Sequence, residues 1–194
     1  MKYLIDPSNI INFNRDDDQL EAFWLFCVLV AGKNAQIQSR KLAEFLEPAN
    51  DQGVSPFDYI RELIQVGELD EKIREHKLGQ YNRISKCFAQ SINVDLRDCH
   101  ISALENIFGV GPKTSRFFMV YTREHSEYAI LDTHILKWIG SNFNVRVPKN
   151  TPVGRVYSKL EELFVFYARE VGQSIADLDL SIWKQYNKPI QYTS

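Results

Sequence analysis

A lysine and an aspartate are the two residues of this sequence whose types and placement could carry out chemistry together. Lys113 follows a Gly-Val-Gly turn in the stretch FGVGPKTSRFF, and Asp132 ends the short apolar run of the stretch AILDTHIL. One expected helix and one loop separate them, so a return of the chain would bring both side chains to one cleft. A neutral lysine amine is a nucleophile that forms imines, and a fixed carboxylate stabilises positive charge and moves protons.

Each of these features also has a simple structural explanation. Asp is a common helix cap, so Asp132 could do no more than begin a helix. A Gly-x-Gly pattern alone is weak evidence, because an ordinary turn between two helices would also explain it. The combination of a lysine and a carboxylate, both at expected helix amino termini, is what a purely structural role does not explain.

The Gly-Val-Gly stretch predicts a tight helix–hairpin–helix. One helix ends near Phe108. Gly109 and Gly111 then flank Val110, whose side chain can plug between the two helices. Glycines permit the positive φ angles that we expect in the hairpin, and Pro112 suits the first turn of the next helix. The exposed amides at the start of that helix would bind an anion, and a DNA phosphate is the natural ligand, because such contacts grip the backbone without reading its sequence.

The elements that must position these residues are helices along the whole chain. Apolar residues recur at steps of three and four, and Asp-rich, Ser-Pro and Thr-Pro starts are typical of helix amino termini. We expect about ten helices and no internal repeat. The weak alternation of NVRVP, residues 144–148, is better explained by a connector than by a strand. The predicted fold class is therefore all-α.

The composition excludes several classes of protein. The chain has 194 residues, of which 44% are hydrophobic and 25% charged, as in ordinary globular proteins. No apolar run approaches the roughly 18 residues of a membrane helix, and the amino terminus lacks the apolar region of a secretory signal, so we expect an intracellular protein that binds no membrane. The three cysteines, Cys27, Cys87 and Cys99, form no CxxC pair. We therefore expect reduced thiols, with neither a disulfide framework nor an iron–sulfur cluster.

Charge is distributed unevenly along a chain whose formal net charge is -2. Residues 133–159 include five basic residues and no acidic one, and residues 71–90 include five basic residues and two acidic ones. These basic segments lie on either side of the Gly-Val-Gly stretch, and basic residues on one face are one feature of DNA-binding proteins. Solvated helix surfaces would give the same pattern, so the charges alone leave both explanations open.

Two stretches together show a resemblance to a known family. LENIFGVGPKTSRFF followed by YAILDTHIL resembles the helix–hairpin–helix signature of the DNA glycosylase superfamily of base-excision repair, which includes endonuclease III and the 8-oxoguanine DNA glycosylases. Upstream, LGQYNRISKCF resembles the Gly-x-Tyr/Phe-Asn segment that precedes the hairpin in that superfamily. The resemblance covers residues 78–138, and the flanks match only in helical layout.

Within that superfamily the sequence of these motifs indicates one branch. The carboxy-terminal cluster cysteines of endonuclease III are absent, and AILD-x-HIL is most similar to the cluster-free archaeal and bacterial 8-oxoguanine DNA glycosylases. Pro112 and Thr114 depart from that branch, where bulkier or acidic residues surround the lysine.

The resemblance implies a role for each residue that matches the superfamily pattern. Lys113 stands where bifunctional members carry the Schiff-base lysine, and Asp132 matches their invariant aspartate. His134 matches a histidine that lies near a DNA phosphate. The DNA-binding residues implied in and after the hairpin are Gly109, Val110, Gly111 and Thr114. The superfamily hairpin commonly binds a monovalent cation through backbone carbonyls; apart from that ion we expect no cofactor and no metal.

Two more groups of candidates follow from the same comparison. Residues 31–36, AGKNAQ, fall where the superfamily places a residue that wedges into the gap left by a flipped base, so Lys33 and Asn34 are candidates. A plain loop between helices is an equal alternative. The candidates for a base pocket are Phe117, Asp179 and Trp183. Core packing for the aromatic residues and a helix cap for the aspartate are the structural alternatives.

The prediction is an all-α, two-lobed helix–hairpin–helix DNA glycosylase fold. Residues 18–132 would form the lobe with the hairpin, and residues 1–17 with 133–194 the second lobe. The expected function is excision of an oxidised base, 8-oxoguanine first, with strand nicking by β-elimination, carried out by a monomer on double-stranded DNA that contains a damaged base. The alternatives are an oxidised-pyrimidine glycosylase and a non-catalytic helix–hairpin–helix DNA-binding module, which would need neither Lys113 nor Asp132.

Overall fold

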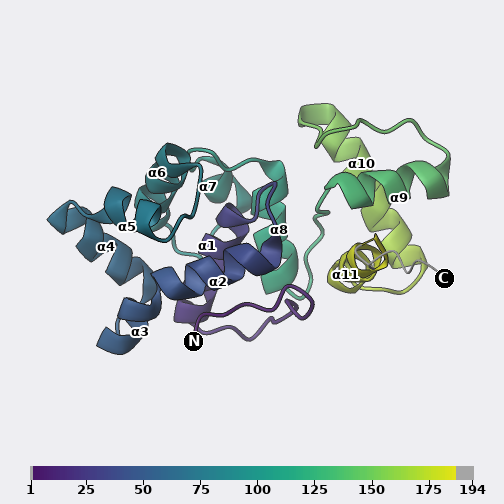
Figure 1. The fold of residues 1–194 in the computed structure, drawn as a ribbon. Coiled ribbons are helices and arrows are strands. Elements are labelled where there is room, and N and C mark those ends of the chain that lie inside the picture. The colour runs from purple at the N-terminus through teal and green to yellow at the C-terminus, as the bar shows by residue number, and fades with distance from the viewer. Residues whose placement is uncertain (1, 187–194) are drawn as a thin grey trace, which may run out of the picture.

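A computed structural model describes residues 2–186 of the chain. In this part of the chain all regular structure is helical, which confirms the predicted all-α class. The helices are α1 Asp17–Leu29, α2 Ala35–Phe45, α3 Glu47–Gln52, α4 Pro56–Val66, α5 Leu69–Glu75, α6 Tyr81–Ser91, α7 Ile101–Glu105, α8 Pro112–Thr122, α9 Thr133–Phe143, α10 Gly154–Glu170 and α11 Ile175–Tyr186. They form two lobes, which the chain between α8 and α9 connects (Figure 1). None of the helices within residues 2–186 is long and apolar enough to span a membrane.

Helix α1 forms the centre of the first lobe. Every residue from 22 to 29 is buried, so the helix is apolar on all sides, as expected of a helix that other helices enclose. It packs against α2, α4, α6 and α8. A capping box fixes its start, since Asp16 accepts a hydrogen bond from the amide of Gln19 and the Gln19 side chain accepts one from the amide of Asp16. Helix α1 thereby supplies a rigid support for α8.

The predicted hairpin joins α7 to α8. Gly109 adopts the left-handed conformation, with φ of 77°. Gly111 is extended, with φ of -110°, and is the N-cap of α8, so the expected positive φ is confirmed at Gly109 and wrong at Gly111. A Cβ atom on Gly109 would lie 2.6 Å from Cγ of Arg83, whose guanidinium donates a hydrogen bond to the Gly109 carbonyl at 3.1 Å. Both its φ angle and the closeness of Arg83 therefore require a glycine at position 109.

Helices α9, α10 and α11 form the second lobe, at the right of Figure 1. Its core contains an aromatic cluster in which the ring centroid of Trp138 on α9 lies 4.9 Å from that of Tyr167 and 5.7 Å from that of Phe164, both on α10. Edge contacts of this kind are favourable for aromatic rings. Helix α11 packs against α9 and α10 and also contacts α8 of the first lobe. The two lobes therefore meet along α8 and α11.

The segment before α1, residues 2–16, lies along the first lobe. The hydroxyl of Ser39 on α2 accepts a hydrogen bond from the amide of Ile5 and donates one to its carbonyl. The buried guanidinium of Arg15 donates a hydrogen bond to the carbonyl of Tyr121 at the end of α8, at 2.7 Å. The same segment also lines the cavity between the lobes, beside α11. Its assignment to the second lobe, and the division of the chain at residue 132, stay predictions.

Candidate active site

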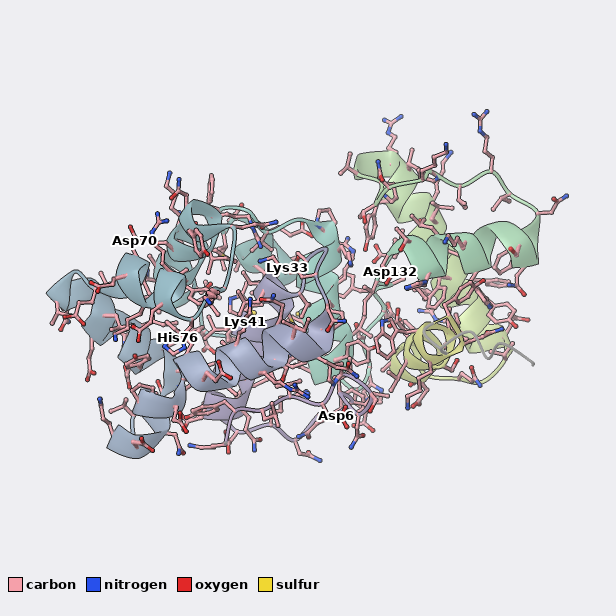
Figure 2. All side chains as sticks on the ribbon, viewed as in Figure 1. Asp6, Lys33, Lys41, Asp70, His76 and Asp132 are labelled. Atoms are coloured by element: carbon pink, nitrogen blue, oxygen red, sulfur yellow. The ribbon has the colours of Figure 1, made fainter. Side chains whose placement is uncertain are left out.

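A cavity of about 380 Å³ lies between the two lobes. Its walls come from the end of α1 and the loop that follows, from α8, from the segment before α9 and from α11. The predicted site residues that line it are Lys33, Asn34, Lys113, Thr114, Phe117, Asp132, His134, Asp179 and Trp183. The hairpin residues Gly109, Val110 and Gly111 lie in the turn just before α8 and are not part of its lining. Figure 2 labels Lys33 on the first lobe and Asp132 where the chain enters the second.

Asp132 is the N-cap of α9. Its Oδ1 atom accepts hydrogen bonds from the backbone amides of His134 at 2.8 Å and Ile135 at 2.9 Å. No residue in the range 2–186 donates a hydrogen bond to Oδ2. The simple explanation of Asp132 as a helix cap is therefore correct as far as Oδ1 is concerned. Because the residue also lines the cavity, its second oxygen remains accessible to a substrate group.

Lys113 lies in the first turn of α8, directly after Pro112. Its side chain is half-buried, and it forms no ion pair or hydrogen bond with any other residue in the described range 2–186. Its amine is therefore not engaged in a structural contact, as a nucleophile requires. The next residue, Thr114, is only 8% exposed, so its predicted contact with DNA stays a prediction.

Asp179 of α11 brings a second carboxyl group to the cavity, where it is only 5% exposed. Its Oδ2 atom accepts a hydrogen bond from the hydroxyl of Tyr121, and its Oδ1 atom is buried without a partner among the described residues. Burial raises the pKa of Asp179 to about 8; the charge of Asp132 acts in the same direction, and the Tyr121 hydrogen bond and the charge of Lys113 act against it. At neutral pH this carboxyl group is protonated, so it can donate a hydrogen bond into the cavity.

Phe117 provides an aromatic wall one turn beyond the lysine. Its ring stacks on Phe23 of α1, with 6.0 Å between the centroids, and meets the ring of Tyr121 edge-on at 5.2 Å. Phe117 is half-buried and lines the cavity, so it packs against core rings, and its role in a base pocket stays a prediction. Trp183 of α11 lines the cavity as well.

The loop between α1 and α2 carries the two candidates for a wedge. Asn34 is the N-cap of α2, where its side chain accepts a hydrogen bond from the helix backbone at 3.0 Å. Lys33 donates a hydrogen bond to the carbonyl of Leu78 at 2.7 Å, and burial, with the nearby charges of Arg83 and Lys41, lowers its pKa. Both side chains have structural contacts and both line the cavity, so the wedge role of either stays a prediction.

His134 lies in the first turn of α9, beside Asp132. Its Nδ1 atom is buried and has no hydrogen-bond partner in residues 2–186, and its ring centroid lies 5.5 Å from that of Tyr186. A buried ring nitrogen without a partner is unfavourable unless a ligand supplies one.

Tyr121 is a cavity residue that was not predicted. The signal that would have found it is its spacing, because Lys113, Phe117 and Tyr121 follow one another at steps of four and therefore lie on one face of α8. That face is the one that lines the cavity.

The described residues offer little to a metal ion. Cys27, Cys87 and Cys99 are free thiols, and residues 2–186 contain no group of three or more His, Cys, Asp or Glu side chains that could hold a metal. In the hairpin, the carbonyls of Gly109 and Gly111 already accept hydrogen bonds from the protein. A monovalent cation at the hairpin stays a prediction.

Comparisons with known proteins agree with the geometry. No family model matches the chain. A Thermoplasma volcanium protein named 8-oxoguanine DNA glycosylase/AP lyase is 28% identical over 180 residues, which cover 87% of this chain and 80% of that protein. A Thermoplasma acidophilum protein of the same name is 27% identical over 170 residues, which cover 82% of this chain and 76% of that protein.

A solved structure shows the same arrangement of helices. The crystal structure of Methanocaldococcus jannaschii 8-oxoguanine glycosylase/lyase in complex with 15mer DNA containing 8-oxoguanine matches with a TM-score of 0.64 at 21% identity, over 89% of this chain and 82% of that chain. A second crystal structure of the enzyme from that organism gives the same TM-score over 96% of this chain and 85% of that chain. The predicted resemblance is confirmed, and the chain has the all-α, two-lobed fold of the helix–hairpin–helix DNA glycosylases.

Proposed function

We propose that this protein is a bifunctional DNA glycosylase/AP lyase that excises 8-oxoguanine from double-stranded DNA and nicks the strand. The observation that carries the proposal is that Lys113 and Asp132 line one cavity between the lobes. Sequence similarity to proteins named 8-oxoguanine DNA glycosylase/AP lyase supports both the reaction and the substrate. A non-catalytic DNA-binding module would have no use for either side chain at this place.

Base release requires a nucleophile and a carboxylate. Extrusion of the damaged base from the duplex costs roughly a few kcal/mol and places the nucleotide in the cavity. As the bond between C1′ and the base weakens, the Asp132 carboxylate stabilises the positive charge that develops on the sugar. The neutral amine of Lys113 attacks C1′, and the base leaves with the electron pair of the broken bond and takes up a proton. Oδ2 of Asp132 is the acceptor for the proton that the amine loses.

Strand nicking follows from the covalent adduct. The sugar ring opens, and the adduct becomes an imine between Lys113 and C1′. Loss of a proton from C2′ then breaks the bond between C3′ and its oxygen, so the phosphate leaves with that electron pair. Water hydrolyses the imine and frees the lysine for another turnover.

The cavity walls would bind the extruded base. Phe117 and Trp183 offer aromatic surfaces against which a flat base can stack. The protonated carboxyl group of Asp179, whose Oδ1 atom has no partner among the described residues, would hydrogen-bond an edge of the base. A neutral carboxyl group suits this task. Burying a charged carboxylate costs more free energy than a hydrogen bond to a neutral base would return.

DNA would be held mainly through its backbone. The amides that begin α8, together with Gly109, Val110 and Gly111, would bind one phosphate, and the buried Nδ1 atom of His134 would hydrogen-bond another. A monovalent cation at the hairpin would strengthen the first contact. We expect the protein to act as a monomer inside the cell.

The test is a panel of duplexes that each contain one lesion. Base release, strand nicking and borohydride trapping are measured on 8-oxoguanine opposite each base, on oxidised pyrimidines, on abasic DNA and on undamaged DNA. The proposal requires release of 8-oxoguanine and a trapped adduct that Lys113→Ala abolishes. Lys184→Ala, the same change at an exposed residue of α11 outside the cavity lining, is the matched control and should leave the adduct intact. Base release only from oxidised pyrimidines would show that the substrate is an oxidised pyrimidine and not 8-oxoguanine. DNA binding without base release and without a trapped adduct would show a non-catalytic DNA-binding module.

A further inference from the structure

The residues directly before Asp132 form no helix or strand, yet side chains of α10 hold their backbone. Ala129 and Leu131 are fully buried. The hydroxyl of Tyr157 donates a hydrogen bond to the Ala129 carbonyl at 2.7 Å and accepts one from the Leu131 amide at 3.3 Å. Glu161, one turn further along α10, accepts a hydrogen bond from the Ala129 amide at 2.9 Å. Two side chains of one helix therefore fix the backbone that delivers Asp132.

Arg116 connects the same glutamate to the helix of Lys113. Its Nε atom lies 2.7 Å from Oε1 of Glu161 and its Nη2 atom lies 3.2 Å from Oε2, which makes a bidentate ion pair. Its Nη1 atom donates hydrogen bonds to Glu105 of α7 at 2.5 Å and to the carbonyl of Pro112 at 3.4 Å. The side chains of Arg116 and Glu161 are only 14% and 12% exposed, so solvent screens their attraction less than at the surface.

These contacts form a continuous path between the two proposed catalytic residues. Arg116 lies one turn after Lys113 on α8, and its guanidinium packs over the ring of Tyr157, 4.5 Å from the centroid. Lys113 lies on α8 of the first lobe and Asp132 caps α9 of the second, and no hydrogen bond or ion pair joins these two side chains. These contacts therefore join the two lobes. The relative position of the lobes sets the distance between the Lys113 amine and the Asp132 carboxylate.

We propose that Arg116, Glu161 and Tyr157 form a bracket that positions Asp132 against Lys113, so that they are positioning residues for base release. The inference rests on the proposed function, because it assigns the bracket to that reaction. Misplacement of a reacting group by about 1 Å can cost on the order of a hundredfold in rate. The bracket acts on the transition state through Asp132 and contributes nothing to the grip on DNA.

The test is a double-mutant cycle between the bracket and the carboxylate. Single-turnover base release is measured for Tyr157→Phe in the wild-type background and again in the Asp132→Asn background, with DNA affinity measured alongside. Tyr157→Phe should slow base release about tenfold or more in the wild type and by no more than about twofold beside Asp132→Asn, because a carboxylate that is already gone cannot be misplaced. Within each background, Tyr157→Phe should leave DNA affinity unchanged.

A matched control is present in the same segment. Tyr128 precedes Ala129, is half-buried, and its hydroxyl makes no hydrogen bond within residues 2–186, so Tyr128→Phe should leave the rate unchanged. If Tyr157→Phe does not fold, Glu161→Gln takes its place in the cycle. The bracket does not position Asp132 if the substitution slows base release by the same factor in both backgrounds, or does not slow it in the wild-type background. A wild-type protein that releases no base overturns the proposed function instead.

Discussion

The hydroxyl of Tyr121 on α8 donates a hydrogen bond to the carboxyl group of Asp179 on α11, and this bond crosses from one lobe to the other at the wall of the cavity. Both side chains are buried, with exposures of 1% and 5%. The bond therefore ties an uncharged carboxyl group to the helix that carries Lys113. The protonation of Asp179 therefore affects the stability of the fold as well as the hydrogen bonds that this carboxyl group can make in the cavity.

Replacement of Asp179 by Asn should remove a pH dependence of stability. The pKa of Asp179 rises from 3.8 to about 8 on folding, because burial disfavours the carboxylate, so between these values the folded state retains a proton that the unfolded state has lost. The wild type should therefore lose stability relative to Asp179→Asn as the pH rises through that range, by roughly 1.4 kcal/mol per pH unit.

Urea unfolding of both proteins at about pH 5 and about pH 7 measures this difference. Asp70→Asn, at an exposed position of α5 (Figure 2), controls for the loss of one negative charge. A stability difference between wild type and Asp179→Asn that is the same at both pH values would contradict the assignment of a buried, protonated carboxyl group.

Replacement of Asp132 by Asn should separate the cap from the catalyst. The amide oxygen of Asn can accept the same two backbone hydrogen bonds, so the start of α9 and the melting temperature should survive. Base release should slow on the order of a hundredfold, if the carboxylate supplies about 3 kcal/mol to the transition state. DNA binding should persist or tighten, because one negative charge has left a surface that faces phosphates.

Single-turnover base release with gel-shift binding tests this expectation. Asp16→Asn makes the same change at the N-cap of α1, which is not part of the cavity lining, and should leave the rate unchanged. Release at the wild-type rate by Asp132→Asn would mean that the aspartate is only a helix cap.

Replacement of Lys113 by Gln should give a different pattern from Asp132→Asn on a pre-formed abasic site. Glutamine cannot form an imine, so both nicking and borohydride trapping should disappear, whereas DNA affinity stays close to that of the wild type. The Asp132→Asn protein retains its lysine and should still nick abasic DNA, more slowly than the wild type. A trapped adduct of full yield with Lys113→Gln would remove this lysine from the mechanism.

Local patterns were sufficient to predict most of the elements and the place of Lys113 and Asp132 at the starts of two helices. Ser55 and Pro56 predict the start of α4 at Pro56, and Asp132 is the helix cap that its position at the end of a short apolar run suggests. These features depend on neighbours in sequence, such as a side chain and the amides two or three residues later, so a single stretch of chain contains the whole signal.

Contacts across the fold were beyond such patterns. Tyr121 and Asp179 are 58 residues apart, and Arg116 and Glu161 are 45 apart, so their pairing depends on how the two lobes dock. The conformation of Gly111 was also out of reach, because a Gly-x-Gly pattern does not say which glycine takes the positive φ. The closeness of the Arg83 side chain to Gly109 could not be predicted either, because the two residues are 26 apart in the sequence.

The two hairpin glycines should respond differently to the same substitution. Gly109→Ala forces a positive φ on alanine, at a cost of about 1–2 kcal/mol, and sets its Cβ atom against Arg83. The variant should melt at a lower temperature. Its DNA affinity should also fall, by the same factor for lesion and undamaged duplexes, because phosphate contacts carry no base information.

Gly111→Ala is the matched variant, because its Cβ atom would meet nothing within 4 Å and its φ of -110° suits alanine. Its melting temperature should equal that of the wild type, so any loss of DNA affinity reports directly on how closely a phosphate approaches the first amides of α8. Melting curves and gel shifts on both duplexes provide the comparison. If Gly109→Ala weakened binding of the lesion duplex alone, the hairpin would take part in base recognition. If Gly111→Ala bound DNA as tightly as the wild type, the phosphate would not approach α8 at this glycine.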